Sequence, residues 1–347
     1  MANARDVAEL AGVSVSTVSR ALTVPEQVSA ATRERVVAAA AQLGYRPNPT
    51  ARGLRMGRTH TLGLLVPDLE NPYFASVTKG VQARARAAGY ALFVADSEED
   101  PTAEPELVAE FSRRVDGVVL ASPRSDDDVL LRAVEGVPVV LVSRDVDGLS
   151  SVAVDDADGV GQALGHLHAL GHRRIAVASG PANSWSGSRR VAGLRQAAEL
   201  LGDVTLVELG TFRPYFSGGF AAADHAMARG ATAVVAFNDL MAIGIVDRLR
   251  ARGVKVPQDM SVVGFDDVAV ATLVSPAITT VRVPRTGLGR RAVDLLVAGL
   301  DPANEGSLLS DRHQQRLAVE LVIRESTGVA RHAPEPHDRG ESSPAPA

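Results

Sequence analysis

A run of side chains near the start of the chain places hydrogen-bonding groups at helical spacing. The run combines hydroxyl groups, a short apolar side chain and a guanidinium, in Ser14, Val15, Ser16, Thr17, Ser19 and Arg20. Arginine can donate two hydrogen bonds to O6 and N7 of guanine, and short side chains can reach a methyl group or a single base edge. The alternative is an ordinary α-hairpin whose polar face is only solvated.

Two short helices joined by a tight turn would hold this run in place. Apolar spacing predicts the inner face of the first helix, formed by Val7, Ala8, Leu10 and Ala11. Gly12 suits the left-handed residue that ends a helix, and the Ser14 hydroxyl can cap the next one. The inner face of the second helix is predicted to contain Val15, Val18 and Leu22.

A third helix is predicted between Ser29, as its cap, and Gly44, with an inner face of Val36, Val37, Ala40 and Leu43. The segment 48–58 that follows has a helical pattern but is shorter than an isolated helix that is stable in water. We expect it to fold only when something holds it. Leu54, between arginines, suits a wedge that enters a minor groove, and the alternative is a basic linker.

Charge is distributed unevenly along the 347 residues. The net charge is −5, but residues 1–58 contain eight arginines and four carboxylates, so this part carries +4 and the remainder −9. Affinity for phosphate is therefore expected in the first 58 residues. The composition is that of a soluble globular protein without cysteine, without an apolar run of membrane-spanning length and without a basic-then-apolar leader, which predicts a cytoplasmic location.

From Thr61 the pattern changes to short aliphatic runs separated by amphipathic stretches. Nine runs predict strands, from LGLLVP and YALFVAD to AVVAFND and SVVGFDD, with helices at 74–88, 159–170, 189–200, 219–228 and 240–251. This alternation is typical of parallel sheets covered by helices on both faces. Because the stretch is too long for one doubly wound sheet, we predict two α/β lobes, although no internal repeat is evident.

These motifs in combination resemble the lactose repressor family of bacterial transcription regulators. The resemblance begins with DVAELAGVSVSTVSRAL and LGYRPNPTARGLR and continues with NPYF at 71–74, RVDG at 114–117, LGHR at 170–173, AFND at 236–239 and SVVGFDD at 261–267. It implies an all-α helix-turn-helix headpiece followed by a two-lobed α/β domain. That domain would resemble periplasmic binding proteins, with two Rossmann-like parallel sheets.

The resemblance implies a homodimer on a palindromic operator, with recognition helices in two major grooves and paired hinge helices in the minor groove between them. Bases would be read by Val15, Ser16 and Arg20, with Leu54 as the intercalating wedge. Contacts to the DNA backbone or groove edges would come from Ser14, Thr17, Ser19 and Arg55.

The implied domains are a headpiece over 1–46, a hinge over 47–59 and a two-lobed body over 60–328. One lobe would take in 60–157 and 285–311, and the other 158–284 and 312–328. The remaining residues, 329–347, are rich in Pro, Glu, Ser and Ala and are predicted to be disordered.

The resemblance also implies a small-molecule effector between the lobes, where the carboxyl ends of parallel strands meet. By motif position, the effector-binding residues are Tyr73, Phe74, Arg144, Ser186, Arg190, Phe212, Asn238 and Asp266. Aromatic rings can stack on a ligand face, while arginine, asparagine and aspartate can bond paired hydroxyls or ring nitrogens. A carbohydrate is favoured, and a nucleoside or purine is left open.

Other motifs predict no catalytic residue, cofactor or metal. The glycines at 159–165 have the spacing G-x-G-x-x-x-G and lack the acidic residue of a dinucleotide site, while His166 and His168 point apart on one helix. The acidic runs at 97–100 and 126–128 are interpreted as solvated charges. The predicted function is a ligand-responsive, sequence-specific repressor that is not an enzyme. The alternatives are a cytosolic sugar- or nucleoside-binding protein or enzyme with a helical extension, and a nucleoid-type DNA binder without an effector.

Overall fold

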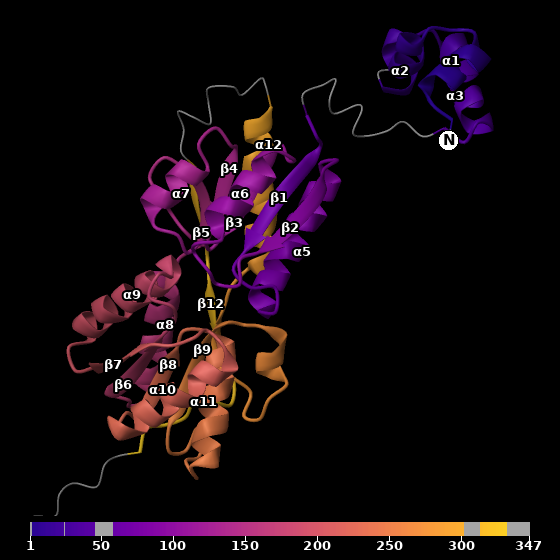
Figure 1. The fold of residues 1–347 in the computed structure, drawn as a ribbon. Coiled ribbons are helices and arrows are strands. Elements are labelled where there is room, and N and C mark those ends of the chain that lie inside the picture. Colours follow the sequence, from indigo (N-terminus) through magenta and orange to yellow (C-terminus); the bar gives the residue numbers. More distant parts are fainter. Residues whose placement is uncertain (1, 24, 46–57, 302–312, 332–347) are drawn as a thin grey trace, which may run out of the picture. The chain divides into compact units, whose positions relative to one another are not determined.

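The computed structural model of the chain describes residues 2–23, 25–45, 58–301 and 313–331. These residues belong to two compact units, which divide between His60 and Thr61. Figure 1 shows that the first unit is helical and that the second contains two lobes, each built around a sheet.

The described part of the first unit contains α1 (Ala4–Ala11), α2 (Val15–Thr23), the 3-10 turn η1 (Pro25–Gln27) and α3 (Ala30–Gln42). Gly12 ends α1 with a φ of 64°, in the left-handed region. The Ser14 hydroxyl accepts the N–H of Thr17 at 3.1 Å, and Ser29 caps α3 by accepting the N–H of Thr32. The predicted turn and both predicted caps are therefore confirmed.

The core of this unit is small and contains Val7, Ala8, Ala11, Val18, Ala21, Val36, Ala39 and Ala40. Two residues that were predicted to face it, Leu10 and Val37, are 48% and 47% exposed. Each residue turns an α-helix by about 100°, so Leu10 and Val37 fall at the border of a face centred on their smaller neighbours. The apolar stripe was therefore predicted one residue too wide on each helix.

The first lobe of the second unit contains β1 (Thr61–Val66), α5 (Pro72–Ala87), β2 (Ala91–Asp96), α6 (Glu104–Ser112), β3 (Gly117–Ala121), α7 (Asp127–Ala133), β4 (Val139–Val142), β5 (Ser150–Val154), α12 (Arg285–Leu300) and β11 (Gln314–Leu317). Its strand order is β11-β5-β4-β3-β1-β2, and all neighbouring strands are parallel. Helices α5 and α12 pack together on this sheet, as do α6 and α7.

The second lobe contains α8 (Asp156–Ala169), β6 (Arg174–Ser179), α9 (Trp185–Leu201), β7 (Thr205–Thr211), α10 (Phe216–Ala228), β8 (Ala233–Ala236), α11 (Asp239–Ala251), β9 (Ser261–Asp266), the 3-10 turn η2 (Ala269–Thr272), β10 (Thr279–Arg282) and β12 (Glu320–Val322). Its strand order is β12-β10-β9-β8-β6-β7, and only the pairing of β12 is antiparallel among the described strands. The predicted fold class is confirmed.

The chain crosses between the lobes at three places. The first crossing lies between β5 and α8, and the second lies between β10 and α12, both close to the predicted positions. The third was predicted near Arg312, but β11 pairs in the first sheet and β12 in the second, so this crossing runs through Ala318 and Val319. The polar strand β11, QQRL, gave no aliphatic signal that would have moved the boundary.

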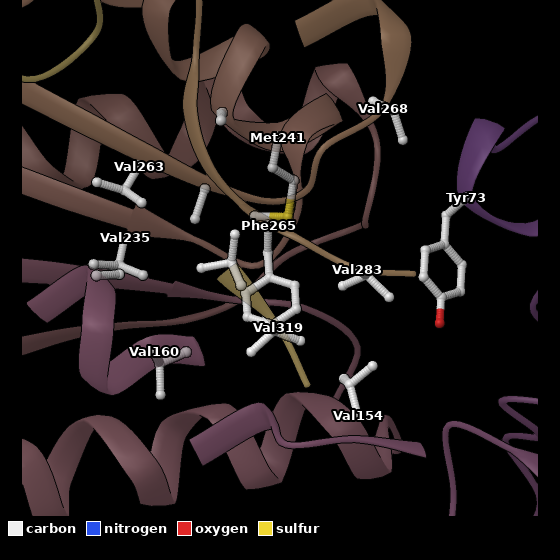
Figure 2. Packing of buried hydrophobic residues seen from close by; sticks show 14 of the residues in the cluster. Tyr73, Val154, Val160, Val235, Met241, Val263, Phe265, Val268, Val283 and Val319 are labelled. Atoms are coloured by element: carbon white, nitrogen blue, oxygen red, sulfur yellow. The ribbon is translucent and has the colours of Figure 1, made fainter. Parts of the chain in front are cut away.

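Valines mark all three crossings. Val154, Val283 and Val319 are buried in one apolar cluster that takes in residues of both lobes. Figure 2 labels these three valines together with Phe265 of the second lobe and Tyr73 of the first, which belong to the same cluster. The lobes are therefore joined through a shared apolar core.

Two pairs of helices approach each other closely through glycines. A Cβ on Gly289 of α12 would lie 2.3 Å from the main-chain oxygen of Val77 in α5. In the second lobe, a Cβ on Gly244 of α11 would lie 2.0 Å from the main-chain oxygen of Phe216 in α10. Only glycine fits these crossings without a backbone shift.

Candidate functional site

A pocket lies between the two lobes, at the carboxyl ends of strands from both sheets. Its empty volume, including its open mouth, is about 370 Å³. The first lobe contributes Asn71, Tyr73, Phe74, Glu99, Ser122, Arg124 and Ser143. The second lobe contributes Ser186, Arg190, Pro214, Phe237, Asn238 and Asp266. This mixture of aromatic rings with hydrogen-bonding groups suits a small polar molecule with one apolar face.

The start of α5 places two aromatic rings in the pocket. Asn71 caps the helix by accepting the N–H of Tyr73 at 3.0 Å. The Tyr73 hydroxyl is 2.7 Å from the Ser143 hydroxyl at the end of β4, and its ring meets Phe74 edge to face. Burial and the nearby Asp266 raise the pKa of Tyr73, so its hydroxyl keeps its proton and can donate it in a hydrogen bond.

Arg190 is the buried cation in the wall of the second lobe. Its Nε donates to Asp156 at 2.8 Å, and its Nη1 donates to the main-chain oxygen of Phe237 at 2.7 Å. The guanidinium carbon lies 3.5 Å from the centre of the Phe265 ring. These contacts fix the guanidinium plane against the pocket.

Asp266 lies at the end of β9 with a φ of 112°, a backbone region that side chains rarely adopt. Burial raises the pKa of its carboxyl group to about 8, although Arg190 opposes this. Arg285 donates a hydrogen bond to the main-chain oxygen of Asp266, so that bond leaves the carboxyl group available to the pocket. A buried carboxyl group in a strained position is typical of a ligand-binding residue.

Asn238 has a structural task as well as a place in the pocket. Its Oδ1 accepts the N–H of Met241 and thereby caps α11, and its Nδ2 donates to the main-chain oxygen of Pro214 at 2.9 Å. The amide therefore ties the start of α11 to the loop before α10, and both flank the pocket.

Six of the eight predicted effector-binding residues line the pocket: Tyr73, Phe74, Ser186, Arg190, Asn238 and Asp266. Arg144 does not, because its guanidinium turns to the main-chain oxygen of Pro123 and to Asp127. Phe212 does not either; its ring packs edge to face on His225. Effector binding by any of these residues stays a prediction.

Sequence reasoning did not assign Asn71, Glu99, Ser122, Arg124, Pro214 and Phe237, which also line the pocket. Ser122 and Phe237 directly follow strands β3 and β8, so a search of every strand end would have found them. Glu99 corrects the interpretation of 97–100 as solvated, because its carboxylate is bound by Arg124. Two acidic residues of the run, Glu98 and Asp100, are exposed as predicted.

The second candidate surface is the polar side of α2. Ser14, Ser16 and Arg20 are exposed, and Val15, Thr17 and Ser19 are half-buried. The Ser14 hydroxyl lies 2.7 Å from that of Ser16 and 2.8 Å from that of Thr17, so the three form a hydrogen-bonded group at the helix start. Leu54 and Arg55 lie outside the described residues.

Over the described ranges, no group of three or more His, Cys, Asp or Glu side chains is arranged to hold a metal ion. His166 bonds Thr327, and His168 bonds Asp203 instead. Within the same ranges, no helix combines the length and the apolar character needed to cross a bilayer.

Comparison with known proteins relates both the pocket and the polar side of α2 to one family. Residues 3–48 match the family described as bacterial regulatory proteins, lacI family, and residues 59–314 match periplasmic binding proteins and sugar binding domain of LacI family. The transcriptional regulator DegA of Bacillus subtilis is 33% identical, over 93% of this chain and 97% of its own. The transcriptional repressor PurR of Haemophilus influenzae is 32% identical, over 94% of this chain and 98% of its own.

Solved structures agree with these relatives. The lac repressor dimer bound to operator and the anti-inducer ONPF superposes with a TM-score of 0.83 at 29% identity, covering 94% of this chain and 99% of its own. The transcriptional regulator CelR in complex with cellobiose gives a TM-score of 0.70 at 32% identity, covering 94% and 100%. The chain therefore belongs to the LacI family and is a helix-turn-helix transcriptional repressor with an effector-binding domain.

Proposed function

We propose that this repressor binds a palindromic operator as a homodimer and is controlled by a carbohydrate in the pocket between the lobes. The observation that carries the proposal is that both lobes line one pocket. A ligand that contacts both walls can bind one lobe orientation more tightly than another. It then stabilises that orientation by the difference between the two binding free energies. Binding in the pocket is then coupled to operator affinity.

A carbohydrate is supported by the chemistry of the lining. Tyr73, Phe74 and Phe237 offer apolar rings, while Arg190 and Asp266 offer donor and acceptor groups for neighbouring hydroxyls. Among the similar solved structures, CelR is described as a complex with cellobiose. A nucleoside or purine would use the same groups and is the alternative that a ligand screen distinguishes.

The DNA-binding end of the proposal is the polar side of α2. Arg20 would donate to a guanine, Val15 and Ser16 would read neighbouring base edges, and the remaining hydroxyls would meet the backbone. Residues 47–59 would join a headpiece over 1–46 to the body over 60–328 and form hinge helices on the operator, with Leu54 in the minor groove and Arg55 beside it. The lobe angle would set whether both hinges form at once. Because the partner is chromosomal DNA, the proposed location is the cytoplasm, and no catalytic role is proposed.

The dimer is supported by the outer strand of the first sheet. The sequence predicted sheets that helices cover on both faces, but the edge strand β2 leaves Phe93 48% and Val94 39% exposed. Apolar side chains on an outer strand are usually covered by a partner. We propose a second copy of this chain, since the similar lac repressor is described as a dimer. Sedimentation should show that Phe93→Ser weakens self-association, whereas Leu200→Ser, at an 83% exposed leucine of the second lobe, does not.

Replacing Arg20 by alanine tests the DNA-binding surface. On an operator selected from random duplexes, Arg20→Ala should cost about 1–3 kcal/mol and relax specificity at one base pair. Arg33→Ala, at an exposed arginine of α3, removes the same charge and should leave specificity unchanged. Equal losses of Arg20→Ala on all sequences would contradict base reading.

The only tryptophan tests the effector half of the proposal. Trp185 begins α9, and the guanidinium carbon of Arg316, on β11 of the first lobe, lies 5.7 Å from its ring centre. Its emission should therefore respond when a bound sugar or nucleoside changes the lobe angle. Deleting residues 1–58 should abolish DNA binding and keep this response; a catalytic turnover in the truncated chain would favour the enzyme alternative.

A further inference from the structure

The wall of the first lobe contains a buried ion pair that faces the pocket. Arg124 donates from Nε and Nη2 to the two carboxylate oxygens of Glu99, at 2.6 and 3.0 Å. Its Nη1 donates to the Ser122 hydroxyl at 2.9 Å. The side chain of Arg124 is 2% exposed and that of Glu99 is 15% exposed, so both groups are held in place largely away from water.

A second carboxylate fixes the loop that carries Arg124. Glu104, at the start of α6, is 1% exposed and accepts the main-chain N–H groups of Arg124 and Ser125, at 2.6 and 2.8 Å. It also accepts the Ser125 hydroxyl at 2.6 Å. Because the backbone on either side of the arginine is bound in this way, the ion pair is preorganised and loses little conformational entropy when a ligand arrives.

The ion pair leaves hydrogen-bonding capacity but no net charge. A guanidinium has five N–H groups, and three of those of Arg124 are used within the described chain. The other N–H groups of Arg124, and the carboxylate lone pairs of Glu99 that Arg124 does not use, belong to pocket-lining side chains and can meet hydroxyl groups, which both donate and accept. An anionic group would instead need an unpaired cation to offset its desolvation. Arg190 in the opposite wall is not an unpaired cation either, because it forms an ion pair with Asp156.

We propose that the Arg124–Glu99 pair determines the ligand specificity of the first lobe. The pair binds adjacent hydroxyl groups of an uncharged sugar and disfavours the phosphate ester of the same sugar. The inference rests on the proposed function in one respect, that a small molecule occupies the pocket. It assigns the choice between neutral and anionic ligands to the first lobe, independently of Arg190 and Asp266 in the second.

The test uses the full-length chain and matched ligand pairs: ribose, glucose and cellobiose, each beside its phosphate ester. Trp185 emission and calorimetry give the dissociation constants. Glu99→Gln keeps the size of the side chain and leaves Arg124 unpaired; it should bind a neutral sugar at least about tenfold more weakly and the matching ester at least about tenfold more tightly than the wild type. Glu98→Gln makes the same charge change at an exposed neighbour and should behave as the wild type.

A second variant covers the case in which Glu99→Gln fails to fold. Arg124→Gln removes the cation and should weaken the neutral sugar without any gain for the ester. A wild-type chain that binds an ester as tightly as its parent sugar, or binds none of the neutral sugars, overturns the inference, as does Glu99→Gln with wild-type constants. Operator binding by the same preparation is measured in parallel, so the DNA-binding function stands or falls separately.

Discussion

The two lobes follow one topological plan but bring different chemistry to the pocket. In each lobe, the pocket residues come from the start of the helix after the first strand, α5 or α9, and from the ends of the next three strands along the chain or the loops after them, β2, β3 and β4 or β7, β8 and β9. The first lobe supplies hydroxyl groups and a matched ion pair. The second supplies the carboxyl group of Asp266, which burial holds protonated near neutral pH.

This difference indicates a division of labour. In the second lobe, burial raises the pKa of Asp156 and Asp239 as well as that of Asp266, with Asp239 at about 7. A ligand that donates hydrogen bonds to Asp266 would relieve part of this desolvation cost, so we expect this wall to supply affinity. The ion pair of the first wall carries no net charge but keeps hydrogen-bonding capacity, so we expect this wall to contribute mainly discrimination between neutral and anionic ligands.

Removing the Asp266 carboxyl group should have the largest effect. Asp266→Ala should weaken binding of the sugar that the screen identifies by about 10- to 100-fold, because removing the carboxyl group leaves buried ligand hydroxyl groups without a partner, at a cost of about 1–3 kcal/mol. Ser143→Ala, at the corresponding strand end of the first lobe, should cost less than about tenfold. Titration of Trp185 emission measures both, and melting curves check that each variant is folded. Similar losses for the two variants would break the comparison.

The glycine crossings test whether the lobes are equally constrained. Gly289→Ala and Gly244→Ala should each lower the free energy of unfolding by about 1–3 kcal/mol, because the added methyl group meets a main-chain oxygen. Gly161→Ala, in α8, has open space and should stabilise the chain by up to about 1 kcal/mol. Urea unfolding gives the three values. A loss for only one crossing would show that one lobe yields more readily.

The pH dependence of stability gives the smallest predicted effect. The pKa of Asp266 is raised to about 8 in the folded chain from an ordinary value of 3.8, so between these pH values the folded state binds more protons than the unfolded state. Stability from this group is therefore complete below about pH 4 and is lost as pH rises toward 8. Asp266→Asn should flatten the fall in melting temperature between pH 5 and 8, by about a few degrees.

A double comparison isolates this carboxyl group from the others. Surface carboxylates such as Asp224 have a lowered pKa because of arginine partners, and they contribute in the opposite direction. Subtracting the pH slope of the melting temperature of Asp266→Asn from that of the wild type removes their contribution. Ser143→Ala is the control variant, because it changes no titrating group. If Asp266→Asn has the same pH slope of the melting temperature as the wild type, the proton that the folded chain retains is not bound to Asp266.

The sequence predicted the fold well because burial of aliphatic runs decides it. All nine runs form β1–β9, since each combines β-branched residues with turn signals at its ends. Strands β10, β11 and β12 were missed because TTVR, QQRL and ELV are short and polar. The sequence also did not reveal that the two lobes share one strand order, because strand pairing depends on hydrophobic pattern and loop length rather than on residue identity.

The sequence predicted the pocket residues that can be recognised one at a time, but not those whose role depends on a partner far away in the chain. Arg190 and Asp266 follow from motif position, whereas Arg124 and Glu99 are separated by 25 residues and acquire their meaning by pairing. Arg144, which closely follows β4, was assigned to the pocket by motif position, but that position does not fix the direction of a long side chain. Its guanidinium found Asp127 and a carbonyl oxygen instead.

The valines at the crossings limit how the lobes can move. Pulling the lobes apart would wet Val154, Val283 and Val319, each at a cost of about 1.5–3 kcal/mol. A rotation of one lobe about this apolar cluster would keep all three buried. We therefore expect the proposed effector to act by rotating one lobe relative to the other rather than by separating the two.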